Sequence, residues 1–298
     1  MPSVAKLVYG VCLLGSLSQG VLATPLASFN TEEVEQALLS DSQKSSHAPL
    51  DEQDVIFVDS SEPENEALDS MLAPSWRTST LMARRLLALS TTGVASTIFP
   101  DPLPPHSRAP GPVAGHSVSL KEYFADCDEA LPEETGNGGD GDPIFLALNV
   151  ATTFRNTAAG SNISLSIDWW DHLDKTRPVF PGFPLSPAGL PRVSLFGYIE
   201  PFETPVPEDT EKALRECYVG AHPDAEVWLP GQPGSPHSSF WARMVVTQVY
   251  WIGGFGGLQK IGWMDVDEWK AIRRKGVSGI GDGRGWEDVQ LPGEDDDS

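Results

Sequence analysis

The chain has 298 residues, with 42 Asp and Glu against 20 Lys and Arg, so its formal net charge is −22 at neutral pH. The acidic residues concentrate in two segments: 24–73 has twelve of them against one basic residue, and 276–298 has seven against one. The body between them, 74–275, carries a net charge of only −6. Binding to nucleic acid or to an anionic membrane surface needs a basic face, so the composition argues against both partners.

Residues 1–23 have the pattern of a cleavable secretory signal peptide. Lys6 precedes an apolar run from Leu7 to Leu17, and Val21-Leu22-Ala23 then offers a cleavage point before Thr24. The apolar run is too short to cross a bilayer, which takes about 20 apolar residues. We therefore expect a secreted protein with no membrane span after cleavage.

The acidic segments differ from the body in composition and define the expected domains. Residues 24–73 are rich in Ser, Glu and Asp and poor in apolar residues, which predicts a disordered arm or a propeptide. The body, 74–275, is long enough for one globular domain, and 276–298 is predicted to be a disordered acidic tail.

The spacing of apolar residues in the body predicts many short strands and a few brief helices. Residues 162–170 alternate strictly between apolar and polar, and 116–124 place Val118, Leu120 and Phe124 on one expected buried face. Strands are predicted at 94–99, 116–124, 144–148, 162–170, 193–199, 240–251 and 260–263, and helices at 75–89, 151–159, 207–218 and 266–273. This order favours an antiparallel barrel or sheet with peripheral helices over alternating βαβ units.

The segments between these elements are predicted to be irregular. Residues 102–112 and 171–191 are rich in proline, 128–142 are rich in glycine and acidic residues, and 253–257 read as a glycine turn between two strands. The same glycines lack the strand-to-helix context and the Lys-Ser/Thr of a phosphate-binding loop.

Two short motifs bear on chemistry. Cys127 and Cys217 remain after the leader with Cys12 is removed, and they form either one disulfide or two buried small side chains. Asn162-Ile163-Ser164 is the one N-glycosylation sequon of the chain. No histidine or cysteine spacing spells out a metal site, and no motif of a catalytic nucleophile or paired carboxylates is present, so no catalytic residue is predicted.

The order of motifs resembles the CREG family of secreted glycoproteins. The resemblance rests on YVGAHPDAEVW (218–228), SSFWARMVVTQVYWIGGFGGLQKI (238–261) and MDVDEW (264–269), preceded in order by GVASTIFP (93–100), GHSVSLKEYF (115–124), PIFLAL (143–148), NISLSI (162–167) and RVSLFGYIEP (192–201). It implies a six-stranded antiparallel split barrel of the pyridoxamine phosphate oxidase-like (FMN-binding) type, peripheral helices, a homodimer, and a secreted, vacuolar or lysosomal location.

The same resemblance implies where a cofactor would lie. Flavin-using relatives of this fold hold FMN at the dimer interface, and an FMN-dependent oxidoreductase here would use Arg84, Arg85 and Lys121 for the phosphate and Trp169 or Trp241 beside the ring. A haem-binding relative would use His222 or His116. Haem-degrading relatives carry a His-Thr-x-Asn motif, whose counterpart in this chain is Thr153-Phe154-Arg155-Asn156.

The chain departs from these relatives in two ways. Thr153 replaces the histidine of the haem motif, and the second predicted strand has one basic residue, Lys121, in place of an arginine cluster. We therefore expect a non-enzymatic CREG-type glycoprotein without a cofactor that acts through protein contacts of its dimer, with the flavin oxidoreductase and the haem-binding protein as alternatives.

Overall fold

The computed structural model describes residues 73–132, 139–170, 177–178, 184–255, 258–274 and 285–294. The predicted leader, 1–23, and nearly all of the predicted arm, 24–73, lie outside these ranges, as do parts of 128–142 and of 171–191. Within the described residues, no helix has the length and apolar character needed to cross a membrane.

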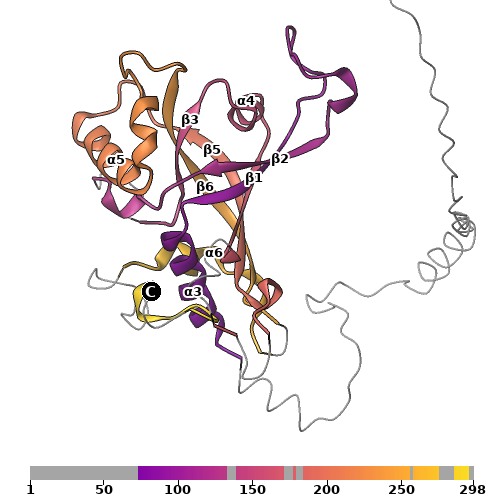
Figure 1. Ribbon diagram of the computed structural model, residues 1–298, viewed down its shortest axis with the longest axis vertical. Coiled ribbons are helices and arrows are strands. Elements are labelled where there is room, and N and C mark those ends of the chain that lie inside the picture. The colour runs from indigo at the N-terminus through magenta and orange to yellow at the C-terminus, as the bar shows by residue number, and fades with distance from the viewer. Residues whose placement is uncertain are drawn as a thin grey trace, which may run out of the picture. The chain divides into compact units, whose positions relative to one another are not determined.

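Seven strands form one antiparallel sheet (Figure 1). The strands are β1 (Thr92–Ile98), β2 (Ser117–Tyr123), β3 (Ile144–Leu148), β4 (Ile163–Asp168), β5 (Arg192–Pro201), β6 (Ser239–Ile252) and β7 (Ile261–Met264). Six of them follow the order β2-β1-β4-β5-β6-β3, and β7 pairs with β6 outside this path.

The sheet curls until its two ends meet. The long strand β6 pairs with β3 along its first part, from Ser239 to Arg243, and with β7 along its last part, from Val249 to Ile252. Ala125, just after β2, exchanges two backbone hydrogen bonds of 2.9 and 3.0 Å with Ile144 of β3. This bridge joins the first strand of the order to the last, which confirms the predicted six-stranded antiparallel split barrel, with β7 as an additional strand.

Apolar side chains at alternate positions of β4 and β5 fill the interior of the barrel. Ile163, Leu165 and Ile167 of β4 are each at most 1% exposed, and Val193 and Leu195 of β5 lie beside them in the same core cluster. The polar residues between them, such as Ser166, face outward. The strict alternation of the sequence therefore sets which face of the sheet is buried.

The predicted buried face of 116–124 is wrong for Leu120, which is 37% exposed, although Phe124 is fully buried. The cause is the position of β2 at the edge of the sheet order, where it pairs with β1 alone. Alternation marks the side of a strand that faces inward, but an edge strand reaches beyond the core, so its inward side chains stay accessible.

Helices flank the two ends of the barrel (Figure 1). Helix α5 (Glu208–Ala221) lies beside β3, and α3 (Trp76–Leu89) and α6 (Val266–Ala271) lie together at the other end. The short α4 (Thr152–Ala158) packs on β1 and β5. Ser75 caps α3 through its hydroxyl, and Asp265 caps α6 through its carboxylate, as the preference for such residues at helix starts predicts.

A disulfide attaches α5 to the segment that follows β2. Cys127 and Cys217 are bonded, across a sequence separation of 90 residues. The structure thus resolves the two alternatives left open by the sequence in favour of the bond. Closing a loop of this length removes much freedom from the unfolded chain, a contribution of about 4 kcal/mol in the chain-entropy model.

The C-terminal acidic segment is not a disordered tail throughout. Residues 285–294 pack on the domain, with Trp286 and Leu291 each 2% exposed. Trp286 shares a core cluster with Leu81 of α3 and Ile272. The prediction of a disordered 276–298 is therefore wrong for 285–294. Two apolar side chains of this segment are buried against the domain, and the carboxylate of Glu294 pairs with Arg85.

Candidate functional site

The two arginines of α3 serve internal contacts. Arg84 is fully buried and donates from one nitrogen to the carbonyls of Trp269 and Ile272, at 3.0 and 3.1 Å, and from another to Gly139, at 3.1 Å. Its guanidinium also lies 5.2 and 5.5 Å from the ring centroids of Trp269 and Trp286. A side chain so placed holds α3, α6 and the C-terminal segment together, away from any surface that could receive a phosphate.

Arg85 binds the C-terminal segment from the next position along α3. Its guanidinium forms a forked ion pair with the carboxylate of Glu294, with a shortest distance of 2.6 Å. The Glu294 side chain is only 2% exposed. Nε and Nη2 of Arg85 both donate to this largely buried carboxylate, so Arg85 also has a structural partner.

The other residues expected around FMN lie apart from one another. Lys121 is exposed on the edge strand β2. Trp169 and Trp241 are each 2% exposed but belong to two different core clusters, and Trp241 packs edge-on against Tyr218 at 5.5 Å between centroids. Within one chain the five residues do not converge on a common pocket, so together they do not form a flavin site there.

The two histidines considered for haem are also separated. His222 is 4% exposed, stacks on Tyr123 at 4.5 Å between centroids, and has its Nε2 2.9 Å from the carbonyl oxygen of Phe124. His116 is exposed at the start of β2. Packing and a backbone contact account for His222.

The stretch Thr153–Asn156 fixes α4 to the first two strands. The hydroxyl of Thr153 donates to the Glu122 carboxylate of β2 at 2.5 Å, and the amide of Asn156 donates to Thr97 of β1 at 3.0 Å. Burial raises the pKa of Glu122 above its ordinary value, an effect that the Thr153 hydrogen bond partly offsets. Both polar residues thus position α4, and Arg155 between them is exposed.

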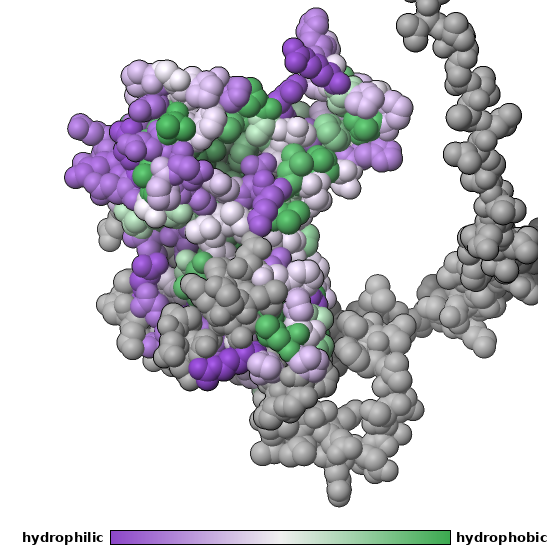
Figure 2. Space-filling model, in the orientation of Figure 1, coloured by the Kyte–Doolittle hydropathy of each residue, from purple (hydrophilic) through white to green (hydrophobic). Residues whose placement is uncertain are grey.

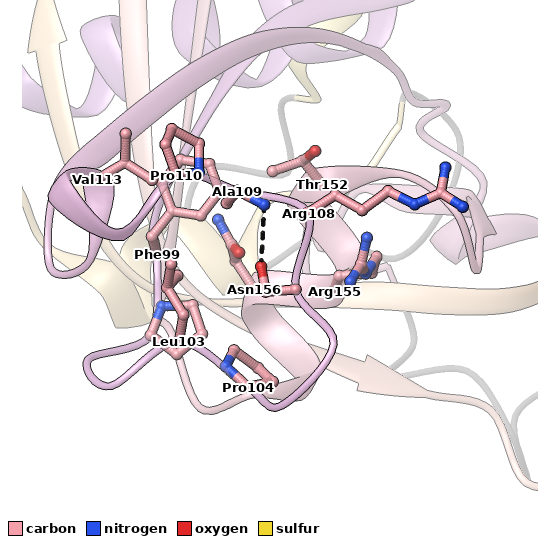
Figure 3. Close-up of a pocket in the computed structure, with 12 residues that line it drawn as sticks. Phe99, Leu103, Pro104, Arg108, Ala109, Pro110, Val113, Thr152, Arg155 and Asn156 are labelled. Carbon is pink, nitrogen blue, oxygen red and sulfur yellow. Dashed lines mark hydrogen bonds between the residues drawn. The ribbon is translucent and has the colours of Figure 1, made fainter.

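A pocket of about 340 Å³ lies between α4 and the proline-rich connection from β1 to β2 (Figure 3). Phe99, Leu103 and Val113 contribute its apolar wall, and Arg108 and Arg155 contribute its positive charges. The rim is held by backbone geometry, including a hydrogen bond of 3.2 Å from the Ala109 amide to the Ser107 hydroxyl. Sequence reasoning missed this pocket, because 102–112 looked only like a connection.

The outer face of the sheet carries three neighbouring aromatic side chains, which we call the aromatic cluster: the exposed Phe196 of β5 and Trp263 of β7, and the half-buried Tyr250 of β6. Trp263 lies 5.5 Å from Phe196 and 5.0 Å from Tyr250 between ring centroids. Trp263 is 58% exposed and Phe196 is 36% exposed. Antiparallel sheets commonly turn polar residues to water on their solvated face, so an aromatic cluster there departs from the usual pattern.

Serine pairs make up part of the outer face. Ser96 and Ser119 share a hydrogen bond of 2.8 Å, and Ser166 and Ser194 share one of 3.1 Å. Beside them runs a groove of about 530 Å³ between β1, β4 and β5, lined by Ile98, Tyr198 and the exposed sequon residue Asn162. The surface over α5 differs from the aromatic cluster, because hydrophilic residues dominate it (Figure 2).

The aromatic cluster was missed as a unit because only the strand register assembles it. Tyr250 pairs with Trp263 across β6 and β7, and with Ser194 across β6 and β5. The alternation of 192–199 places Phe196 and Tyr198 on the other side of the strand from Leu195 and Val193. This was the one sign in the sequence that aromatic side chains face outward. Metal chemistry gains no support: among the described residues no group of three or more His, Cys, Asp or Glu could hold an ion.

A curled antiparallel sheet closed by a bridge between its end strands, with helices at both ends, defines a split-barrel protein. The CREG β-barrel family model matches residues 74–271. The chain therefore belongs to the CREG β-barrel family, as its motifs indicated. No curated relative matches it in sequence.

Solved structures similar to this chain have low identity to it. A haem-binding protein from Mycobacterium smegmatis is 18% identical with a TM-score of 0.43, over 66% of this chain and 61% of its own. The General Stress Protein 26 from Bacillus anthracis is 11% identical with a TM-score of 0.34, over 59% and 95% of the two chains. A haem storage protein from Vibrio cholerae is 10% identical with a TM-score of 0.34, over 57% and 92%. Likeness at this level carries no argument about function.

Proposed function

We propose that this protein is a secreted, vacuolar or lysosomal CREG-type glycoprotein that acts without catalysis, through protein contacts of a homodimeric split barrel. The observation that carries the proposal is the aromatic cluster on the outer face. Large, rigid side chains such as Trp263 and Phe196 bury much area at little entropic cost, and they are the residue types that dominate protein interfaces.

The internal contacts of the two α3 arginines support a role without a flavin. The groups that would neutralise a phosphate at Arg84 and Arg85 are instead bound to backbone carbonyls and to Glu294. Releasing them would break three hydrogen bonds to buried carbonyls and separate a buried carboxylate from its guanidinium partner, at a cost of several kcal/mol. A flavin oxidoreductase, the alternative for this fold, would have to hold its phosphate elsewhere.

The absorption spectrum of protein purified from a secretory host tests this proposal against its alternatives. We expect a colourless protein that takes up no added FMN or haemin. A retained or readily acquired flavin band, or a Soret band, would overturn the non-catalytic proposal in favour of the flavin or haem alternative. The spectrum of a sample refolded from denaturant, with cofactor present, removes the concern that the host failed to supply it.

The glycoprotein part of the proposal has its own test. Asn162 is exposed and immediately precedes β4, so the glycosylation machinery can reach it. Asn162→Gln should raise the gel mobility of the secreted protein, and Asn149→Gln, which changes an exposed asparagine outside any sequon, should not. Equal mobility of the Asn162→Gln variant and the unchanged chain would contradict use of the sequon.

A further inference from the structure

From the pocket between α4 and the β1–β2 connection, we infer a binding site for a small organic anion, one that combines a compact apolar body with a carboxylate or phosphate. This inference does not depend on the proposed function, since the pocket is lined by neither the aromatic cluster nor the residues expected around a flavin. Its evidence is a cavity that is lined by apolar side chains and by two arginines.

The two arginines come from different segments. Arg108 belongs to the connection and Arg155 to α4, and Figure 3 shows both guanidinium groups on the same side of the pocket. Both side chains are exposed, and neither has an ion-pair partner among the described residues. The lining therefore holds two positive charges and no carboxylate, and an anion in the pocket can pair with guanidinium groups that have no other counter-ion among the described residues.

The charge of the site contrasts with the rest of the chain. The full sequence carries a formal charge of −22, yet no Asp or Glu is among the residues that line the pocket. A positive site in an acidic protein selects anions by local contact rather than by long-range attraction, because the overall field opposes their approach. Arginine suits this role since its planar fork matches carboxylate and phosphate oxygens.

The other wall of the pocket is apolar, so it suits a ligand with an apolar body. Phe99, Leu103 and Val113 are half-buried, so part of each side chain faces the cavity, and Pro100, Pro104 and Pro110 complete the wall. Proline fixes φ near −65°, which restrains the connection before any ligand arrives. A wall held in place in this way reduces the ordering cost of binding. The cavity of about 340 Å³ is suited to a body the size of one aromatic ring with its anionic group.

Calorimetric titration of the full-length secreted chain with four probes tests the inference. Phenyl phosphate and benzoate carry both features, inorganic phosphate carries only the charge, and benzyl alcohol carries only the ring. We expect saturable binding of phenyl phosphate or benzoate, with inorganic phosphate and benzyl alcohol each at least about tenfold weaker. Which of the two anions binds more tightly identifies the headgroup that the site prefers.

Variants separate the site from general charge effects. Arg108→Gln with Arg155→Gln should weaken the better probe about tenfold or more, whereas Arg215→Gln, an exposed arginine on α5, should leave its affinity unchanged. Leu103→Ser should weaken phenyl phosphate but not inorganic phosphate. The inference fails if neither organic anion saturates, if inorganic phosphate binds as tightly as both, or if the double variant binds normally while thermal unfolding shows that it is folded.

Discussion

At the scale of single residues, Arg84 ties three parts of the chain together with one side chain. Replacing it by Met keeps much of the volume but removes three buried hydrogen bonds, and it leaves the carbonyl of Trp269 without this donor, while Arg273 still donates to Gly139 and Ile272. Unpaired buried acceptors are costly, so Arg84→Met should lower the free energy of unfolding by about 3 kcal/mol or more. Denaturant titration measures this, with the exposed Arg215→Met as the control, expected within about 0.5 kcal/mol of the unchanged chain.

Glu122 gives a second prediction at this scale, on pH dependence. Burial raises the pKa of its carboxyl above the ordinary 4.5, so the folded state holds the proton more tightly than the unfolded state does. Its contribution to stability is therefore full below pH 4.5 and is lost as the pH rises through the raised value. Glu122→Gln keeps an acceptor for Thr153 and removes this loss. The variant should be more stable than the unchanged chain at pH 7 and equally stable near pH 4, as measured by denaturant titration; a larger advantage at pH 4 would contradict the assignment.

At the scale of elements, the docking of 285–294 on α3 replaces the disordered tail expected from composition. Trp286 packs against Leu81 and beneath the Arg84 guanidinium. Trp286→Ala removes a buried ring and should cost about 3–5 kcal/mol of unfolding free energy. The same change at Trp76, which is 39% exposed, should cost clearly less. If the two variants unfold alike, the segment does not contribute to the folded domain.

The disulfide between α5 and the segment after β2 is a second feature at this scale. Replacing both Cys127 and Cys217 by Ala opens a loop whose ends are 90 residues apart, so unfolding should require about 4 kcal/mol less free energy. The stability of the unchanged chain with and without a reductant gives an independent measurement. Agreement between the two experiments is expected, and an unchanged stability in both would contradict the bond.

Local elements could be predicted from the sequence, but the contacts that assemble them could not. Ile163, Leu165 and Ile167 are buried as their alternation predicts, and α3 spans nearly the range expected from helical spacing. Arg84 looked like a ligand contact because an arginine on a helix reveals nothing of the distant carbonyls of Trp269 and Ile272 that surround it. Phe196 and Trp263 meet only through two strand pairings, which composition and spacing do not specify.

At the scale of the whole molecule, the outer face of the barrel determines how the protein is proposed to work. The aromatic cluster is exposed at the β5–β7 side of this face, and Asn162 lies along the groove between β1, β4 and β5. The large exposed side chains of Trp263 and Phe196 make the aromatic cluster the expected contact of the dimer. Association through exposed aromatic side chains buries apolar area, which should make it insensitive to salt.

The mass of the secreted protein in solution, measured by light scattering during size exclusion, tests this account most directly. The unchanged chain is predicted to have twice the mass of one chain in both low and high salt, and Phe196→Ser with Trp263→Ser to have the mass of one. Val227→Ser, which removes a 53% exposed apolar side chain elsewhere, should leave the dimer intact. A folded, unchanged chain that remains a monomer at high concentration, or a double variant that remains a dimer, would contradict the account.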